Sequence, residues 1–413
     1  MSAPLQSIRG MHDETPATTP SWLALEASLS RLATLYGYQQ IRTPLLEANT
    51  VFNRSLGEET DVICKEMYSF EDRNGQVLSL RPEGTASCVR AGIQHGLFHN
   101  QVQSLWYLGP MFRRERPQKG RLRQFHQFGV ELFGMPSVQC EVELIAFSQQ
   151  LWQILGIKDL TLEINTLGTA DDRKLYRETL INYFEPHLAS LNSDEQRRLR
   201  ENPLRLLDSK NPALKPLIDA APLMSECLSA DSHQRFETWQ SELAQLGITF
   251  THNPYLVRGL DYYNDAVFEW KSQALGAQGT ICAGGRYDGL VAQMGGQHTP
   301  AVGMAMGLER ILALLNQNKQ RTPSLFILSE MNALDKQQTI AQSLRNTLPN
   351  CIVKVDHKGG SLKSQLKRAI KHNATWAVVL SENGAHQLKF LKQDLPTQTL
   401  SEAQLTTWIT QLD

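Results

Sequence analysis

The sequence predicts an α+β domain with a mainly antiparallel sheet flanked by helices, a helical insertion within it, and a C-terminal α/β domain. Three observations lead to this fold class. Strand–turn–strand patterns with amphipathic helices fill residues 1–168 and return in 248–318. Residues 169–247 show helical spacing with little strand signal, and residues 323–413 alternate strands with helices. We take these ranges as the predicted domains.

Composition sets limits on the class of protein. A chain of 413 residues is too long for one ordinary core. The formal net charge of −1 means that contacts with nucleic acid must come from local basic patches. The 6 cysteines form no CxxC pair and no secretory leader is visible, so we expect reduced thiols in a cytoplasmic protein. No run of 18 apolar residues predicts a membrane helix, and no zinc motif is present.

The N-terminal region predicts a helix followed by an edge strand. Apolar residues recur at steps of three and four over residues 21–36, and Gly37 ends the helix. A strand over residues 38–42 follows. Pro44 cannot donate to a central ladder, so this strand is expected at an edge or an interface. A plain core helix with an edge strand gives the same pattern.

Residues 67–90 predict a β-hairpin followed by a helix. Asn74 and Gly75 form a turn signal between two strand-like runs. Glu83 and Thr85 then place a carboxylate and a hydroxyl two residues apart, a pair suited to gripping an ammonium group. The alternative is a helix cap, in which Thr85 bonds the backbone and Glu83 favours the positive helix end.

A second amphipathic helix is predicted over residues 137–155, and a strand over residues 160–168. Residues 169–247 are rich in Leu, Glu, Arg and Asn, with prolines in the middle. This composition predicts the helical insertion. Its function cannot be deduced from these residues alone.

Residues 112–131 predict two strands joined by a basic loop. Between residues 113 and 123 the loop carries six basic residues against one acid, Glu115. Arginine pairs with phosphate oxygens in bidentate fashion, so the loop suits a polyphosphate substrate, although a solvated basic hairpin is the simpler alternative. After the loop, Gln127 and Glu131 share one side of a strand. The basic residues are Arg113, Arg114, Arg116, Lys119, Arg121 and Arg123.

Three further stretches combine glycine with polar or aromatic residues. VRGLDYY (257–263) places one Arg and two Tyr around a Gly, and GTICAGGRYDGLV (279–291) is a Gly-rich strand and turn. VGMAMGLERIL (302–312) alternates small and large residues and enters a helix at Leu308. Neither a Walker loop nor a dinucleotide fingerprint occurs. A strand with an outward arginine and interfacial tyrosines would be the alternative for the first stretch.

The C-terminal region predicts a small α/β domain with a mostly parallel sheet. On its helix over residues 361–372, Leu362, Leu366 and Ile370 are expected to face inward. A basic stripe occupies another face, and such a stripe is usually a solvated surface. It consists of Lys363, Lys367 and Lys371.

Taken together, these stretches resemble the histidyl-tRNA synthetases, a family of class II aminoacyl-tRNA synthetases (class IIa). Residues 112–131 resemble motif 2, RPEGT resembles the family's α-amino-binding segment, and VRGLDYY matches its signature. Residues 302–312 resemble motif 3, with Ala305 where the common form has Gly. The N-terminal helix, strand and Pro44 resemble motif 1, which builds the dimer interface.

The resemblance implies the class II synthetase fold with an anticodon-binding C-terminal domain, and it implies a ligase that makes histidyl-adenylate and charges tRNA(His). Arg113 and Arg258 would act on the α-phosphate. The implied ATP-binding residues are Arg113, Glu115, Arg121, Phe125 and Arg310. The implied histidine-binding residues are Glu83, Thr85, Gln127, Glu131, Arg258, Tyr262, Tyr263, Gly285 and Tyr287.

The resemblance also implies partners: L-histidine, ATP with Mg²⁺ bridging its phosphates, tRNA(His) and a second copy of the chain, without a membrane. No protein side chain is predicted to hold a metal. The residues implied to contact tRNA are Arg116, Gln118, Lys363 and Lys367.

Two alternatives within the resemblance make different predictions. A non-catalytic regulatory paralogue of the family binds histidine but typically loses motif arginines and the anticodon domain. Here the four arginines and a C-terminal domain are present. A class IIa synthetase for threonine or proline would not carry LVRGLDYY. The four arginines are Arg113, Arg121, Arg258 and Arg310.

Overall fold

The computed structural model describes residues 5–57, 60, 62–118, 120–207, 209, 211–315, 323–330, 334–348, 350–381 and 384–410. The chain divides into two compact units, Met1–Asn316 and Gln317–Asp413. The linker predicted after Asn318 lies outside the described residues, up to residue 322.

An eight-stranded sheet forms the centre of the first unit, in the order β1-β5-β6-β11-β10-β9-β7-β8. All neighbours are antiparallel except the edge pairs β1–β5 and β7–β8, which confirms the predicted mainly antiparallel sheet. The strands are β1 (Gln39–Gln40), β5 (Gln103–Phe112), β6 (Gln124–Phe133), β7 (Leu160–Thr166), β8 (Thr251–His252), β9 (Asn264–Ser272), β10 (Thr280–Arg286) and β11 (Ala301–Gly307).

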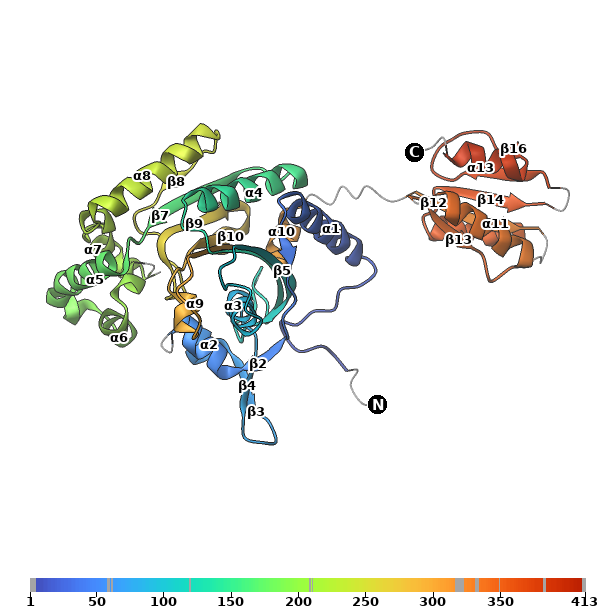
Figure 1. The fold of residues 1–413 in the computed structure, drawn as a ribbon. Coiled ribbons are helices and arrows are strands. Elements are labelled where there is room, and N and C mark those ends of the chain that lie inside the picture. Colours follow the sequence, from blue (N-terminus) through green and yellow to red (C-terminus); the bar gives the residue numbers. More distant parts are fainter. Residues whose placement is uncertain are drawn as a thin grey trace. The chain divides into compact units, whose positions relative to one another are not determined.

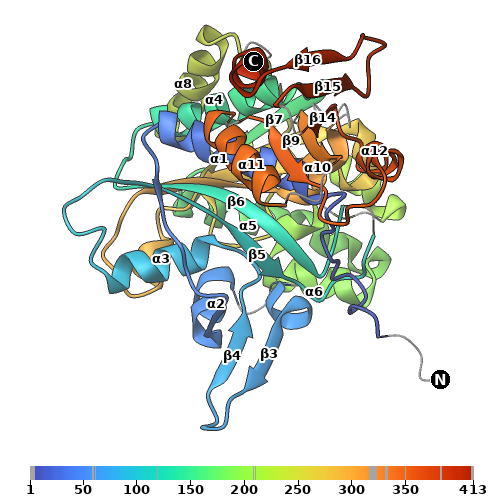
Figure 2. The ribbon, with the colours of Figure 1, turned by 90° about the vertical axis from the view of Figure 1, so that its right-hand side faces the viewer.

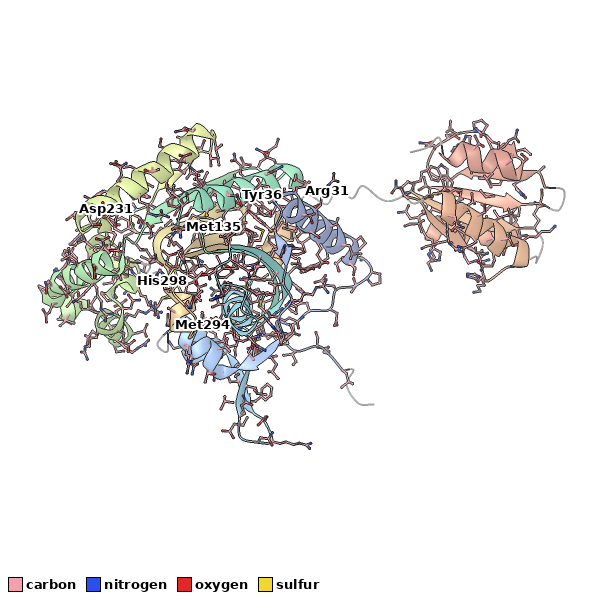
Figure 3. All side chains as sticks on the ribbon, in the orientation of Figure 1. Arg31, Tyr36, Met135, Asp231, Met294 and His298 are labelled. Atoms are coloured by element: carbon pink, nitrogen blue, oxygen red, sulfur yellow. The ribbon has the colours of Figure 1, made fainter. Side chains whose placement is uncertain are left out.

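Helices cover both faces of this sheet because its strands alternate between two apolar cores. Helices α1 and α4 lie on one face of the sheet, and α2 and α3 lie on the other (Figure 1 and Figure 2). Phe128 and Val130 of β6 enter the core that includes residues of α1 and α4, whereas Tyr107 of β5 enters the core that includes residues of α2 and α3. Tyr36, labelled at the end of α1 in Figure 3, packs on Phe147 of α4, and the ring centres lie 5.0 Å apart. The helices are α1 (Thr19–Leu35), α2 (Asn49–Leu56), α3 (Thr85–Gln94), α4 (Gln139–Leu155), α9 (Leu290–Gln293) and α10 (Leu308–Leu314).

The predicted N-terminal elements form with shifted ends. Helix α1 begins at Thr19, and no side-chain hydrogen bond caps it. The edge strand predicted over residues 38–42 shortens to β1, which pairs only with β5 at the sheet edge, as Pro44 indicated.

A three-stranded sheet in the order β2-β4-β3 extends from the first unit. The hairpin predicted around Asn74 is β3–β4. Gly75 at its turn has a φ of +77°, a backbone conformation that would be strained in a residue with a Cβ atom. A π-helix precedes this hairpin. The elements are β2 (Leu46–Ala48), a π-helix (Val62–Glu66), β3 (Tyr68–Glu71) and β4 (Val77–Leu80).

The segment predicted as a helical insertion contains two parts. Its helices up to residue 227 surround their own apolar core, which includes Tyr176, Leu199 and Leu214. The last helix, α8, instead buries Phe236 and Trp239 in the main core beside α4. The elements are α5 (Ala170–Phe184), α6 (Ser193–Glu201), α7 (Lys215–Asp219), α8 (Ala230–Gln245), and 3-10 turns at Glu185–Ser190, Pro203–Leu206, Pro212–Leu214 and Met224–Glu226.

The second unit is a five-stranded sheet in the order β13-β12-β14-β15-β16, with helices packed on it. The pairs of β12 are parallel, and those of β15 are antiparallel, so the predicted parallel character holds for half of the sheet. The elements are β12 (Ser324–Ser329), α11 (Leu334–Thr347), β13 (Ile352–Val355), α12 (Leu362–Lys371), β14 (Trp376–Leu380), β15 (His386–Phe390), β16 (Gln398–Leu400) and α13 (Glu402–Thr410).

On the predicted inward face of α12, Leu362 and Leu366 pack against a core of this unit as expected, but the prediction for Ile370 is wrong. Gln365 and Ala369 are the buried residues of α12, whereas Ile370 is 61% exposed. Gln365 bonds both the backbone N–H and the carbonyl of Ser329, and this satisfied polar contact sets which face turns inward. Within the described residues, no helix combines the length and the apolarity that crossing a membrane requires.

Candidate active site

A cavity of about 190 Å³ lies against the large sheet, where residues of β6, β10 and β11 line it. Strand β6 and helix α3 supply one side, the loop over residues 113–125 a second, and the segment over residues 258–263 a third. The cavity brings together nearly all the residues predicted to bind histidine or ATP. These are Glu83, Thr85, Arg113, Glu115, Arg121, Phe125, Gln127, Glu131, Arg258, Tyr262, Tyr263, Tyr287 and Arg310.

The buried end of the cavity is organised around Glu131, which is 1% exposed. Its carboxylate accepts hydrogen bonds from the hydroxyls of Thr85 (2.7 Å), Tyr107 (3.3 Å) and Tyr287. Burial raises the pKa of Glu131 to about 8, although the three hydroxyls act to lower it. A carboxyl fixed by three hydroxyls is preorganised to accept a further hydrogen bond from a ligand.

Gly303 provides the space that this carboxyl occupies. It lies directly opposite Glu131 in the β11–β6 ladder. A Cβ atom on Gly303 would lie 1.7 Å from Oε2 of Glu131 and 2.8 Å from the carbonyl oxygen of Val130. Glycine is therefore required here for close approach rather than for an unusual backbone angle.

The hydrogen bonds of Glu83 and Thr85 differ from both interpretations of the sequence. Glu83, not Thr85, caps helix α3, because its carboxylate accepts from the backbone N–H groups of Thr85 and Ala86 at 2.7 Å each. The Thr85 hydroxyl instead donates to Glu131. Burial raises the pKa of Glu83. Both side chains still line the cavity, and Gln127 beside them accepts from the N–H of Gly84 at 3.1 Å.

Arg258 lies beside the tyrosines. Burial alone would lower its pKa, but the carboxylate of Glu269, to which Nη1 donates, outweighs burial and the pKa is raised. The guanidinium carbon lies 5.5 Å from the centre of the Tyr263 ring. Among the described residues, no partner bonds its buried Nε. Arg258 is thus a permanent cation whose buried Nε–H is available to a ligand.

The wider end of the cavity gathers three arginines. Arg113 donates to the Pro82 carbonyl at 2.9 Å and packs 5.3 Å from the ring centre of Phe125. Arg310 donates to the Gly120 carbonyl at 2.9 Å, and burial together with the charges of Arg121 and Arg113 lowers its pKa. Mutual repulsion of this kind favours an anionic ligand between the cations.

The negative charge of Glu115 partly compensates the positive charges of the three arginines. It is 8% exposed, forms an ion pair with Arg121 and lies 4.0 Å from Nη1 of Arg113. An incoming phosphate would compete with this carboxylate for Arg121. Among the described residues, no three acids, histidines or cysteines gather in a way that could hold a metal ion.

The remaining predicted residues lie outside the cavity. Gly285 does not line it: a Cβ there would lie 2.5 Å from the Ala266 carbonyl and 2.9 Å from the Tyr263 ring, so this glycine lets neighbouring elements pack. Arg116 and Gln118 are exposed at the tip of the basic loop, and Lys119 lies outside the described residues. Lys363 and Lys367 are exposed on α12 in the second unit.

Comparison with known proteins decides the family. The family model described as "Histidyl-tRNA synthetase" matches residues 10–311. The "Histidine--tRNA ligase" of Hydrogenovibrio crunogenus is 48% identical over 416 residues, which cover 98% of each chain. The chain belongs to the histidyl-tRNA synthetase family.

Solved structures agree with this membership of the histidyl-tRNA synthetase family. The apo histidyl-tRNA synthetase of S. aureus matches with a TM-score of 0.81 and 31% identity, covering 98% of this chain and all of that one (100%). The histidyl-tRNA synthetase of Nostoc sp. PCC 7120 matches the fold with a TM-score of 0.72 at 19% identity, covering 99% and 100%. The predicted class II fold is therefore confirmed.

Tyr107 is the main site residue that the sequence did not reveal. It lies on β5 opposite Gly129, and added Cβ atoms on Gly129 or Gly84 would come within 2.2 Å of its ring. The pairing of β5 with β6 brings Gly129 to Tyr107, and Gly84 reaches it from the start of α3. No motif in the sequence pointed to Tyr107 or to its contact with Glu131.

The raised pKa of Glu131 predicts how stability depends on pH. Because the pKa is raised from 4.5 to about 8, this carboxyl stabilises the fold fully below pH 4.5, and the contribution is lost as pH rises through the folded pKa. Relative to Glu131→Gln, the wild type should lose up to about 1.4 kcal/mol of unfolding free energy per pH unit in that window. Urea unfolding of both proteins at pH 5.5, 7 and 8.5 measures this. Parallel pH profiles would contradict the buried, protonated carboxyl.

Proposed function

We propose that the chain is an ATP-dependent ligase that activates L-histidine to histidyl-adenylate and transfers it to the 3′ end of tRNA(His). One observation carries the proposal: a single cavity joins a buried carboxyl surrounded by tyrosine hydroxyls to a cluster of arginines around an aromatic ring. The first part suits an imidazole, and the second suits a nucleoside triphosphate.

The buried end would select histidine. Neutral imidazole has one donor and one acceptor, so its pocket needs polar groups of both kinds. Glu131 would accept from one ring nitrogen, and the Tyr263 hydroxyl would bond the other. Burial raises the pKa of Tyr263, so its hydroxyl keeps its proton near neutral pH. The α-ammonium group would meet Glu83, Thr85 and Gln127, while Tyr262 and Tyr287 would enclose the ring.

The arginines would carry out adenylation by positioning and charge stabilisation. A carboxylate oxygen of histidine attacks the α-phosphorus, the new P–O bond forms, and the bond to pyrophosphate breaks. Arg113 and Arg258 would stabilise the charge on the α-phosphate. Arg121 would leave Glu115 to hold the β- and γ-phosphates together with Arg310. Phe125 would stack on adenine.

Transfer to tRNA would follow in the same cavity. The terminal ribose hydroxyl of tRNA(His) attacks the histidyl carbonyl, the new ester bond forms, and AMP leaves. A phosphate oxygen of the adenylate would accept the hydroxyl proton, so no side chain need act as the general base. Arg116 and Gln118 at the exposed loop tip, and Lys363 and Lys367 on α12, would contact the tRNA backbone.

Magnesium would accompany ATP. With no three-ligand cluster among the described residues, the ion would be held mainly by the phosphates, with Glu115 and Glu309 as the carboxylates nearest the arginine end among those that line the cavity. When bound, it would neutralise phosphate charge during the displacement. The arginines remain the groups of this chain that orient the phosphates.

We also propose that the protein is a cytoplasmic homodimer. Apolar side chains lie exposed on and beside the three-stranded sheet, and a second copy could cover them. Sedimentation equilibrium should therefore give twice the mass of one chain, and a mass of one chain would refute the proposal. The residues and their exposed fractions are Leu45 (42%), Leu46 (38%), Phe70 (49%) and Val77 (40%).

Aminoacylation tests the proposed function. Purified protein with ATP, magnesium and radiolabelled histidine should charge tRNA(His) but not a tRNA for another amino acid. Histidine binding without charging would indicate a regulatory histidine-binding protein instead. Charging with threonine or proline would leave the fold unchanged but reject the histidine pocket.

A further inference from the structure

The segment that carries Arg258, Tyr262 and Tyr263 forms no helix or strand. Between β8 and β9 it runs through bends and turns, so no backbone ladder holds its cavity-lining side chains in place. Placing catalytic and binding groups well requires support from neighbouring side chains. Glu269 of β9 supports Arg258, whereas the support of Asp261 and of the Tyr263 backbone comes from the helical insertion.

The first support is a hydrogen bond to the backbone of the segment. Arg173, in the first turn of α5, donates from Nη1 to the carbonyl oxygen of Tyr263 at 2.6 Å. This carbonyl comes directly before β9, so the bond holds the segment at the point where it enters the sheet. A bond from a charged donor is worth more than one from a neutral donor.

The second support is on the side chain of Asp261. Nη2 of Arg205 donates to both carboxylate oxygens at 2.9 Å, and the amide of Asn202 donates to Oδ1 at 2.9 Å. Both donors come from the insertion, at the junction of α6 and the following 3-10 turn. We call these contacts of Arg205 and Asn202 with Asp261 the clamp. Asp261 directly precedes Tyr262, so the clamp lies one residue from a side chain that lines the cavity.

Apolar contacts join the same two parts. Leu204, between Asn202 and Arg205, packs against the core of the insertion and also against the core that contains Tyr262 and Tyr263. Val257, which precedes Arg258, also packs against both of these cores. The contact is therefore a packed interface with polar clamps, rather than an isolated surface ion pair.

We propose that Arg173, Asn202 and Arg205 are positioning residues, through which the helical insertion sets the affinity of the cavity for histidine. They touch no substrate: they hold the backbone of Tyr263 and the carboxylate of Asp261, and so keep Tyr262 and Tyr263 in the geometry that meets the amino acid. The ATP-binding end is held independently by β6, the basic loop and α10. This inference rests on the proposed function, since histidine is the ligand whose affinity should change.

Arg173→Met and Asp261→Asn test the proposal in ATP–pyrophosphate exchange. Each should raise KM for histidine about ten- to a hundredfold, as expected when a binding group is misplaced, with KM for ATP within about twofold. Arg177→Met is the matched control. It lies one turn further along α5 and donates to the Arg200 carbonyl at 3.0 Å inside the insertion, so its KM for histidine should match the wild type.

A double-mutant cycle separates positioning from general destabilisation. Arg205→Met and Asp261→Asn remove the same contact, so their double variant should raise KM for histidine little more than either single variant. Arg173→Met and Asp261→Asn remove different contacts, so their effects on KM for histidine should be roughly additive in free energy. Arg205→Lys, which keeps a cation, should recover part of the histidine affinity. Melting temperatures are measured for every variant.

The outcomes are distinct. A KM for histidine within about twofold of wild type in Asp261→Asn and Arg173→Met overturns the inference, and so does an equal rise in the KM values for histidine and ATP. Asp261 is 33% exposed, so Asp261→Asn decides the question if Arg173→Met fails to fold. A wild type without any histidine-dependent exchange overturns the proposed function, which the variants alone do not test.

Discussion

Arg113→Ala is expected to reduce kcat for adenylate formation by about 10²–10³-fold, the usual loss when one preorganised donor to developing charge is removed. Arg113 is held by the Pro82 carbonyl and by the Phe125 ring at the arginine end of the cavity. Among the described residues, the hydrogen bonds that hold Glu131 come from Thr85, Tyr107 and Tyr287 and not from Arg113, so histidine binding should be largely kept. Pyrophosphate exchange measures the rate, and isothermal titration measures histidine affinity.

Arg114→Ala is the matched control for this variant. Arg114 is the next residue in the chain and equally basic, but its side chain is exposed and does not line the cavity. Its exchange rate should match the wild type. Near-normal turnover in Arg113→Ala, or equal losses in the two variants, would refute the role of Arg113 at the α-phosphate.

Gly303→Ala is expected to raise KM for histidine about a hundredfold while ATP affinity is kept. The added methyl would overlap the Glu131 carboxylate, which hydroxyls from three different elements hold in place, and it would also press on the Val130 carbonyl. Backbone oxygen moves less easily than a side chain, so Glu131 must swing away from the imidazole.

Gly289→Ala serves as the control for adding a methyl nearby. Gly289 lies two residues from Tyr287, outside the cavity, and its added Cβ would meet no atom within 4 Å. This variant should bind histidine like the wild type. If Gly303→Ala also keeps its histidine KM, the Glu131 carboxyl is not the imidazole contact.

Local patterns in the sequence predicted most of the fold. The hairpin at Gly75, the edge strand before Pro44, and the helices α1 and α4 depend on turn residues and apolar periodicity, which act over a few residues. Of the predicted inward face of α12, only Ile370 was predicted wrongly, because apolar spacing grouped it with Leu362 and Leu366. The buried amide of Gln365 could be recognised only once its contacts with Ser329 were known.

The site was predictable to the extent that motifs carry it. RPEGT, the basic loop and VRGLDYY named the residues that line the cavity, because their chemistry suggests anions and an imidazole. The contacts that organise them are long-range. Glu131 meets Tyr107 and Tyr287 across 24 and 156 residues, and Arg173 reaches Tyr263 across 90 residues. Such pairs appear only after the sheet and the insertion have formed.

The same physical reason explains why the position of α8 could not be predicted. Its apolar face predicted a helix correctly, but periodicity does not say which core that face enters. The first helices of the insertion close their own core, and Trp239 of α8 joins the main core instead. The insertion is thus attached to the sheet domain both through α8 and through the clamp on Asp261.

ATP–pyrophosphate exchange with each of the twenty amino acids in turn, without tRNA, tests the central claim most directly. The claim is that one cavity selects an imidazole at its buried end and activates the attached carboxylate with ATP at its arginine end. We expect exchange with histidine alone. Exchange driven by another amino acid, or histidine binding without any exchange, would contradict it.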